Sequence, residues 1–279
     1  MLVKLNAHGA KKYIDHAYGL ALDKRRSGYP TYTDGIKAKR DFVDAINELA
    51  AGQNSELLLF ECDGKALGLL GYFFVPDDKY IQVSIMDIED KTDAALSEFV
   101  EYARRRFSGY ELNIGVPAEN VAARTFLLDN GFDCIENAYH YTLVFDRYSA
   151  IAESGNVRAV TPESFGDFKA LHDGEDMYWT SDRIFETLSK WRVFVYYEGG
   201  APVGAIYSIG TDTPEIFGVD FVSGFDTTVY RALLTKLLNS LKAAGARHLT
   251  YFVEGNERAV AEELGFKAVG EYFCFVEVL

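Results

Sequence analysis

The chain has 279 residues, of which 48% are hydrophobic and 14% are aromatic, and its formal net charge is −14. This length and composition exclude a disordered chain and allow two hydrophobic cores. The negative charge disfavours nucleic acid, whose binding depends on neutralising phosphates with Lys and Arg. No apolar run suits a signal peptide or reaches the length of a membrane span. We therefore expect a cytoplasmic protein that binds neither nucleic acid nor a membrane.

The first half of the chain predicts a mixed α/β domain. Phe42, Ile46 and Leu49 recur at helical spacing and form one apolar face, whereas the Asp-Gly pair before Lys65 predicts a hairpin. In chain order we expect a strand (2–5), two helices (about 10–25 and 36–50), three strands (57–62, 66–74 and 80–88), a long helix (93–107), a strand (110–116), a helix opened by Asn120 and closed by Gly131-Phe132, and a terminal pair of strands.

The second half repeats this order. Gly64 recurs as Gly200 at an offset of 136, and the helix-closing Gly131 recurs as Gly265 at an offset of 134. A nearly constant offset indicates two diverged copies, which we place at 1–147 and 148–279 with a polar linker over 146–156. The second copy is expected to contain strands at 157–160, 192–198, 202–209, 215–222 and 247–253, and helices at about 162–172, 181–191, 227–243 and 256–264.

The cysteines and histidines form no metal-binding pattern. Cys62, Cys134 and Cys274 stand singly in strand-like runs without a CxxC pair, which is typical of reduced, buried thiols. The five histidines are dispersed and show no HExxH spacing: His8, His16, His140, His172 and His248. We expect no disulfide and no metal cofactor.

The doubled element order and two similar helices carry a family resemblance. NVAARTFLLDNGF (120–132) and NERAVAEELGF (256–266) each run from Asn to Gly-Phe before the last strands. With the glycine hairpins, they make the chain resemble the GNAT superfamily of acyl-CoA N-acyltransferases, twice over nearly its whole length. The resemblance implies two tandem α/β (α+β mixed sheet) domains that could pack as an intramolecular pseudo-dimer.

The same resemblance implies a reaction class. GNAT proteins transfer an acyl group from acetyl-CoA or another acyl-CoA to a primary amine, here on a small molecule or a peptide. The alternative is a GNAT-like pseudoenzyme that keeps the fold as a ligand-binding or regulatory module.

The turn before the long helix distinguishes the copies. In the family, the CoA pyrophosphate lies on backbone amides of this glycine-rich turn. The first copy has MDIEDKTDAAL (86–96), without glycine and with several acids, so we expect its CoA loop to be lost. The second copy has FVSGFDTTVYRALL (221–234) and is the likelier acyl-CoA site by resemblance. The cofactor-binding residues implied there are Phe221, Val222, Gly224, Thr227, Thr228, Val229, Arg231 and Asn256.

Two features of the second copy's turn favour the alternative. Asp226 stands where a helix cap is expected and would satisfy the first amides itself. Tyr230 takes the position of a family glycine and would crowd a pyrophosphate.

Candidate groups for proton transfer lie on two equivalent strands. The family's general acid, a Tyr four residues before the Gly-Phe glycine, is replaced by Leu127 and Ala261. Asp87 and Asp220 are the candidate bases, and Asp220 is our candidate catalytic residue because it belongs to the second copy. Either carboxylate could instead be a solvated strand residue.

Two connections are candidates for the acceptor site. Acids interleaved with aromatics suit a cationic amine, although ordinary surface loops are the alternative. The first connection (25–35) contains Tyr29, Tyr32 and Asp34, and the second (172–182) contains Asp173, Glu175, Asp176, Tyr178 and Trp179.

Overall fold

The computed structural model describes residues 1–172, 178–211, 213–253 and 255–279, which fall into two compact units. Unit 1 consists of Met1–Ala138 and Val269–Leu279, and unit 2 consists of Tyr139–Ala268. These units differ from the expected copies, 1–147 and 148–279, because residues 139–147 belong to unit 2 and residues 269–279 belong to unit 1.

Unit 1 contains a mixed sheet in the order β1-β2-β3-β4-β5-β12. Its neighbours are antiparallel except for the parallel pair β4 and β5. The elements are β1 (Leu2–Leu5), α1 (Ala7–Ala10), α2 (Ile14–Ala21), α3 (Lys39–Ala51), β2 (Ser55–Cys62), β3 (Lys65–Val75), β4 (Tyr80–Ile88), α4 (Thr92–Arg106), β5 (Glu111–Pro117), α5 (Val121–Asp129), the start of β6 (Asp133–Val144) and most of β12 (Lys267–Val278).

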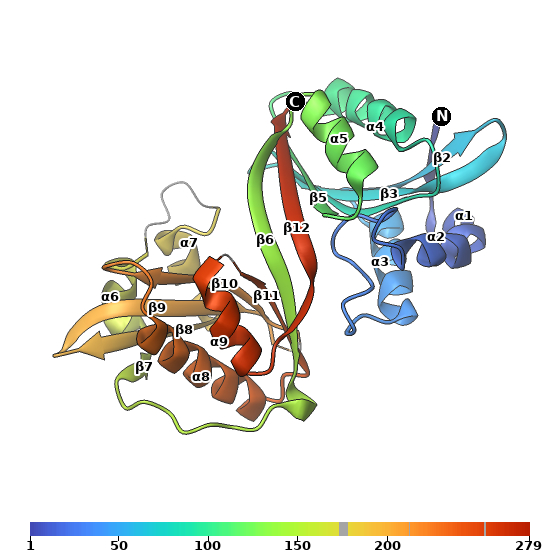
Figure 1. Ribbon diagram of the computed structural model, residues 1–279. Helices are drawn as coiled ribbons and strands as arrows, with labels where there is room; N and C mark the ends of the chain where they lie inside the picture. The colour runs from blue at the N-terminus through green and yellow to red at the C-terminus, as the bar shows by residue number, and fades with distance from the viewer. Residues whose placement is uncertain (173–177, 212, 254) are drawn as a thin grey trace. The chain divides into compact units, whose positions relative to one another are not determined.

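Helices cover both faces of this sheet (Figure 1). Leu57 and Leu59 of β2 pack in one core with α1, α2 and α3, whereas Leu58 and Phe60 pack in another with α4 and α5. This alternation follows from the two-residue period of a strand. Both faces are buried, so β2 and β3 read as continuous apolar runs rather than alternating ones.

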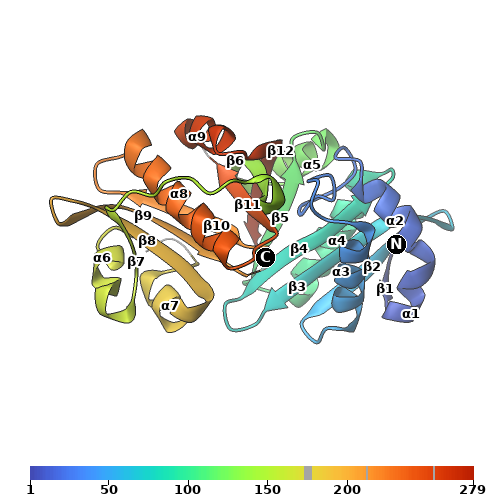
Figure 2. The same ribbon diagram turned by 90° about the horizontal axis from the view of Figure 1, so that it is seen from below.

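Unit 2 repeats the arrangement in the order β6-β11-β10-β9-β8-β7, with β10 and β11 parallel. Figure 2 shows α8 along one face, with α6 and α7 on the other, in agreement with the two cores of this unit. The elements are β7 (Val157–Ala159), α6 (Phe165–Lys169), α7 (Ser181–Glu186), β8 (Trp191–Glu198), β9 (Ala201–Ile209), β10 (Glu215–Phe221), α8 (Thr227–Ala243), β11 (His248–Val253) and α9 (Arg258–Glu263).

Each copy ends in one long strand instead of the expected pair. The runs of β6 and β12 contain no proline, and Gly270 in β12 does not adopt a positive φ, so nothing turns either chain back. β6 pairs with β11 inside unit 2, and β12 pairs with β5 inside unit 1. Each sheet is thus completed by the terminal strand of the other copy.

The parallel ladders at the centre of both sheets are short. In unit 1, β4 and β5 pair only from Tyr80–Val83 opposite Glu111–Ile114. In unit 2, β10 and β11 pair only at Glu215 and Ile216. Beyond these residue pairs, no further pairing joins the two strands in the described part of the chain. We call this region the splay of each unit: it lies after Val83 and Ile114 in unit 1, and after Ile216 and Tyr251 in unit 2. Backbone amides and carbonyls in the splay need partners other than the neighbouring strand.

No helix in the described part of the chain is long and apolar enough to span a membrane. Cys62, Cys134 and Cys274 are free thiols, but they are not all buried, contrary to expectation. Cys274 is buried, whereas Cys134 is exposed.

Candidate functional site

Asp220 lies on β10 beside the splay of unit 2 and pairs with a buried histidine. Its Oδ2 is 2.9 Å from Nδ1 of His172, whose side chain is fully buried, while the Asp220 side chain remains 23% exposed. Nε2 of His172 lies 2.9 Å from the carbonyl oxygen of Trp179. Asp220 is the catalytic residue predicted from the sequence, whereas His172 is one of the five dispersed histidines, for which no role was predicted.

The contacts of His172 define where its protons lie. A carbonyl oxygen only accepts hydrogen bonds, so Nε2 must carry a proton to bond to Trp179. Nδ1 faces a carboxyl group, so one further proton lies between Nδ1 and Asp220. With this proton on the ring, Asp220 is a carboxylate and its second oxygen, Oδ1, is available to another donor.

Aromatic side chains hold the His172 ring in place. Phe168 of α6 stacks on it at 5.0 Å between ring centroids, and Tyr207 of β9 meets it edge-on at 5.1 Å. Tyr207 lies across Gly218, where a Cβ atom would come within 2.2 Å of its hydroxyl. Burial, followed by the nearby Asp220 charge, raises the pKa of Tyr207, which therefore stays protonated. The ring and the carboxyl group thus have fixed positions.

A backbone amide next to Asp220 faces the splay. Val222 N donates to Val203 O at 3.2 Å, toward β9. Successive amides of a strand point to opposite edges, so the Phe221 amide points toward β11. The β10–β11 ladder ends at Ile216, and Phe221 N lies beyond its last rung. A donor and a carboxylate therefore occupy neighbouring positions on the same strand.

The turn that follows β10 is capped by its own carboxylate. Gly224 adopts a φ of +85°, a conformation that favours glycine. Oδ1 of Asp226 accepts from Thr228 N at 2.7 Å and from Val229 N at 2.9 Å. The helix cap expected as an alternative at Asp226 is therefore present, and it occupies two amides that could otherwise meet a phosphate.

The remaining predicted cofactor-binding residues differ in exposure. Val222, Thr227 and Thr228 are exposed around the turn, and Phe221 is half-buried. Arg231 forms an ion pair with Glu263 of α9, and Asn256 is exposed in the 3₁₀ turn before α9.

Tyr230 does not crowd this turn, contrary to expectation. Its side chain is fully buried in the core beneath α8, where its hydroxyl lies 3.3 Å from that of Tyr251. The helical phase directs residue 230 inward, alongside Leu233 and Leu237.

Comparisons with known proteins place this arrangement in a fold family. No protein-family model and no curated protein matches the sequence. A GCN5-related N-acetyltransferase from Sphaerobacter thermophilus is similar in structure, with a TM-score of 0.67 and 13% identity, over 100% of this chain and 95% of the other. One from Kribbella flavida has a TM-score of 0.56 and 14% identity, over 75% and 86% of the two chains.

A tandem GNAT protein from the clavulanic acid biosynthesis pathway is also similar. Its TM-score is 0.53 at 16% identity, over 100% of this chain and 98% of the other. The chain has a tandem GNAT fold. This agrees with the resemblance that the two Asn-to-Gly-Phe helices carried in the sequence.

The two GNAT units differ at the equivalent aspartates. Asp87 pairs with Leu69 on β3 as Asp220 pairs with Ala205 on β9, each one rung from a glycine. Asp87 is only 3% exposed, and burial raises the pKa of its carboxyl well above the usual range. Burial therefore disfavours the charged form of Asp87, whereas the Asp220 side chain is partly exposed and paired with His172.

The tyrosine positions of the GNAT family hold core residues here. Leu127 of α5 and Ala261 of α9 are both fully buried. Neither has a group that can donate a proton, as the sequence indicated.

The acceptor connection of the first copy is closed. Tyr29, Tyr32 and Asp34 are all buried, and the Asp34 carboxylate accepts from the amides of Ile36 and Lys37 at 2.8 and 2.9 Å. These residues stabilise their own loop and do not form an open binding surface.

The acceptor connection of the second copy lies beside Asp220. Trp179 packs on Trp191 and Phe217, and Tyr178 is 46% exposed beneath the Arg183 guanidinium. Asp173, Glu175 and Asp176, also predicted from the sequence for this connection, lie outside the described residues. The described part of this connection therefore contacts the Asp220–His172 pair, because the Trp179 carbonyl oxygen accepts a hydrogen bond from His172.

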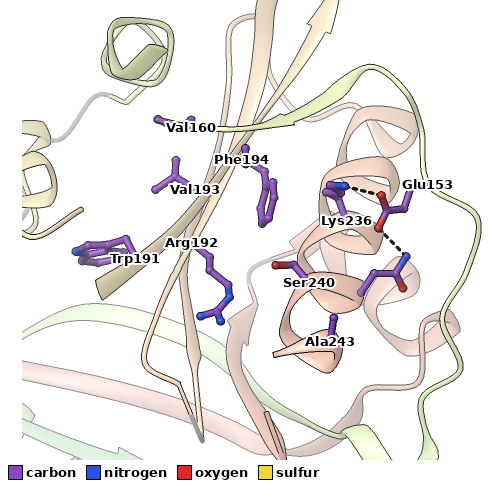
Figure 3. Close-up of a pocket in the computed structure, with 11 residues that line it drawn as sticks. Glu153, Val160, Trp191, Arg192, Val193, Phe194, Lys236, Ser240 and Ala243 are labelled. Carbon is purple, nitrogen blue, oxygen red and sulfur yellow. Dashed lines mark hydrogen bonds and ion pairs between the residues drawn. The ribbon is translucent and has the colours of Figure 1, made fainter. Parts of the chain in front are cut away.

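A cavity of about 500 Å³ lies elsewhere in unit 2, between β8 and α8 (Figure 3). Arg192 and Phe194 point toward α8 there, where Lys236 pairs with Glu153 of the linker at 2.5 Å. It shares no residue with the Asp220–His172 pair or the turn after β10. Within the described ranges, no group of three or more His, Cys, Asp and Glu side chains could hold a metal ion.

Proposed function

We propose that this chain transfers an acyl group from acetyl-CoA or another acyl-CoA to a primary amine, using unit 2. The observation that carries the proposal is the position of the Asp220–His172 pair. Asp220 directly precedes Phe221 on β10, and the Phe221 amide lies beyond the last residue pair between β10 and β11. The three free cysteines fit the reducing cytoplasm, where we propose that the chain acts.

The Phe221 amide is the proposed donor to the thioester carbonyl. Attack by an amine turns that carbonyl oxygen into an oxyanion, and a fixed N–H stabilises it without reorganisation. CoA would lie along the turn from Phe221 to Thr228, beside the backbone of the buried Val229, with Arg231 and Asn256 at its border. Gly224 allows the backbone of this turn to approach the pyrophosphate.

Asp220 is the proposed proton acceptor. The amine enters as an ammonium ion, and one N–H proton passes to Oδ1 of Asp220, which frees the lone pair that attacks the thioester carbon. His172 holds Oδ2 by its Nδ1 proton, and this contact orients the carboxylate. The C–S bond then breaks, and the amide nitrogen releases its second proton to water. The proton on Asp220 passes through water to the CoA thiolate, so that the products are a neutral amide and the CoA thiol. A net charge of −14 favours a cationic acceptor.

The direct test measures release of free CoA thiol from acetyl-CoA with a panel of diamines, amino sugars and peptides with free N-termini. We expect at least one amine to raise thiol release above the amine-free rate, with the acetylated amine visible by mass spectrometry. If no amine is acetylated at millimolar concentrations of both reactants, the proposal fails.

A ligand-binding module without catalysis is the second candidate. The Asp226 cap favours it, because its carboxylate lies where the phosphates would bind and already occupies two amides. Like charges in this position oppose CoA binding.

Asp226→Ser tests whether this carboxylate opposes CoA binding. Serine caps a helix about as well as aspartate, so the variant should fold normally while losing one negative charge. We expect it to bind acetyl-CoA about fivefold more tightly, since a repulsion near the surface costs about 1 kcal/mol. Calorimetric titration of both proteins measures the change. A weaker affinity in the variant would show that Asp226 helps to bind the cofactor.

A further inference from the structure

The splay of unit 1 contains a segment of the chain itself. Residues 26–29, in the connection between α2 and α3, bond to both strands that border it. Ile88 N of β4 donates to Arg26 O, and Tyr29 N donates to Gly115 O of β5, each at 2.9 Å. The segment therefore bridges the two strands where their own ladder has ended.

The Ile88 amide is the counterpart of the Phe221 amide in unit 2. Ile88 pairs with Gly68 and Phe221 pairs with Gly204, in the same register of their hairpins. In unit 2 this amide lies beyond the last rung of the ladder, whereas in unit 1 it bonds to Arg26 O. The equivalent donor is thus already occupied in unit 1.

A buried asparagine, Asn120, forms a hydrogen bond with the middle of the segment. Nδ2 of Asn120 donates to Ser27 O at 3.0 Å, while Oδ1 of the same side chain accepts from Ala123 N at 3.1 Å. Asn120 is only 2% exposed. The residue that caps α5 therefore also holds the segment in the splay.

The segment fits closely. A Cβ atom on Gly28 would lie 3.0 Å from Cβ of Met86 and 3.2 Å from Gly115 O, which is tighter than ordinary contact. Ser27 and Tyr29 are buried, and the Tyr29 ring meets that of Tyr272 at 4.5 Å between centroids. Little space remains for another molecule between β4 and β5.

We propose that residues 26–29 are the built-in occupant of the unit 1 splay, so that unit 1 takes no acyl donor and the chain has one donor site. Two strand-type hydrogen bonds, the Asn120 tie and the close approach at Gly28 act together to keep the segment in place. The proposal concerns unit 1 alone and holds whether or not unit 2 is catalytic.

Amide hydrogen exchange of the intact chain tests the proposal without a substrate. We expect the amides of Tyr29 and Ile88 to exchange at least about 10³-fold more slowly than in an unstructured peptide, as in the sheet around them. Millimolar acetyl-CoA should leave both rates unchanged. Exchange of either amide at the unstructured rate, or faster exchange upon addition of acetyl-CoA, would overturn the proposal.

Matched glycine variants test the close fit. Gly28→Ala should raise exchange at Ile88 about tenfold, because the added methyl group displaces the segment. Gly19→Ala, on α2, is the control, since a Cβ there meets nothing within 4 Å, and it should leave the Ile88 rate unchanged. Equal rates at Ile88 in both variants would contradict the close fit.

A second pair of variants covers the case in which Gly28→Ala does not fold. Asn120→Ser keeps a side-chain oxygen for the α5 cap but cannot reach Ser27 O, and Asn120→Ala loses both contacts. We expect both to raise exchange at Tyr29, and only Asn120→Ala to raise exchange at Ala123. Unchanged exchange at Tyr29 in both would show that the tie does not hold the segment.

Discussion

Asp220→Asn is expected to lower kcat by about 10²- to 10⁴-fold, the usual contribution of a general base. Asparagine keeps the shape and can still contact His172, but it cannot accept the proton of the ammonium ion. KM for acetyl-CoA should change little, because the turn proposed to bind CoA follows Phe221 and does not include Asp220. Steady-state kinetics with the amine found in the acetylation screen measures both constants.

Two companion variants make this result specific. Asp87→Asn changes the equivalent, buried aspartate of unit 1 and should leave kcat unchanged, since the neighbouring Ile88 amide is already bonded to Arg26 O. His172→Gln keeps a donor toward Asp220 and should lower kcat less than Asp220→Asn does. A loss in Asp87→Asn as large as that in Asp220→Asn would place the chemistry in unit 1.

Glu56→Gln is expected to have the largest effect on stability in unit 1. Glu56 of β2 is 4% exposed. Burial alone would raise its pKa, but hydrogen bonds from cations and hydroxyls lower the pKa to about 2, from an ordinary 4.5. The donors are Lys4 Nζ and Arg106 at 2.6 Å, Tyr102 at 2.5 Å and Tyr72 at 2.7 Å. The difference corresponds to about 3 kcal/mol of free energy of unfolding.

The pH dependence of this contribution has a definite sign. The folded-state pKa of Glu56 lies below the ordinary value, so the stabilisation is fully present above pH 4.5 and is lost as the pH falls toward 2. Urea unfolding of the wild type and of Glu56→Gln at pH 7 and pH 3 measures this contribution. The difference between their free energies of unfolding should be smaller at pH 3 than at pH 7. Glu101→Gln, which breaks an exposed pair with Arg105, is the control and should cost less than about 1 kcal/mol. A gap that grows at pH 3 would contradict the assignment.

Much of the fold could be predicted because its elements are long and regularly patterned. The expected bounds of β4 and α8 match the structure, since both have uninterrupted periodicity and clear flanking turns. The terminal strands were predicted incorrectly. A strand's pattern shows which faces it buries, but the pattern does not show which sheet it joins. The local sequence of β6 and β12 therefore did not show that each strand joins the sheet formed mainly by the other copy.

The site was only partly predictable for a related reason. Asp220 could be proposed from its place on the fourth strand, and Asp226 from its position before a helix. His172 lies 48 residues from Asp220, and no spacing rule links a histidine at a helix end to a strand residue so distant. The segment at 26–29 was also missed, because its bonds to Ile88 and Gly115 are made by the backbone. Backbone contacts between distant segments depend on tertiary packing and not on side-chain type.

Calorimetric titration of acetyl-CoA into the intact chain, with Thr228→Glu and Thr228→Gln alongside, tests the central claim most directly. Thr228 is exposed at the start of α8, where glutamate is compatible with a helix but repels a phosphate. We predict one site per chain, lost in Thr228→Glu and retained in Thr228→Gln. Two sites per chain, or one site that Thr228→Glu leaves intact, would place acyl-CoA elsewhere, and the absence of binding at millimolar ligand would contradict acyl transfer from acetyl-CoA.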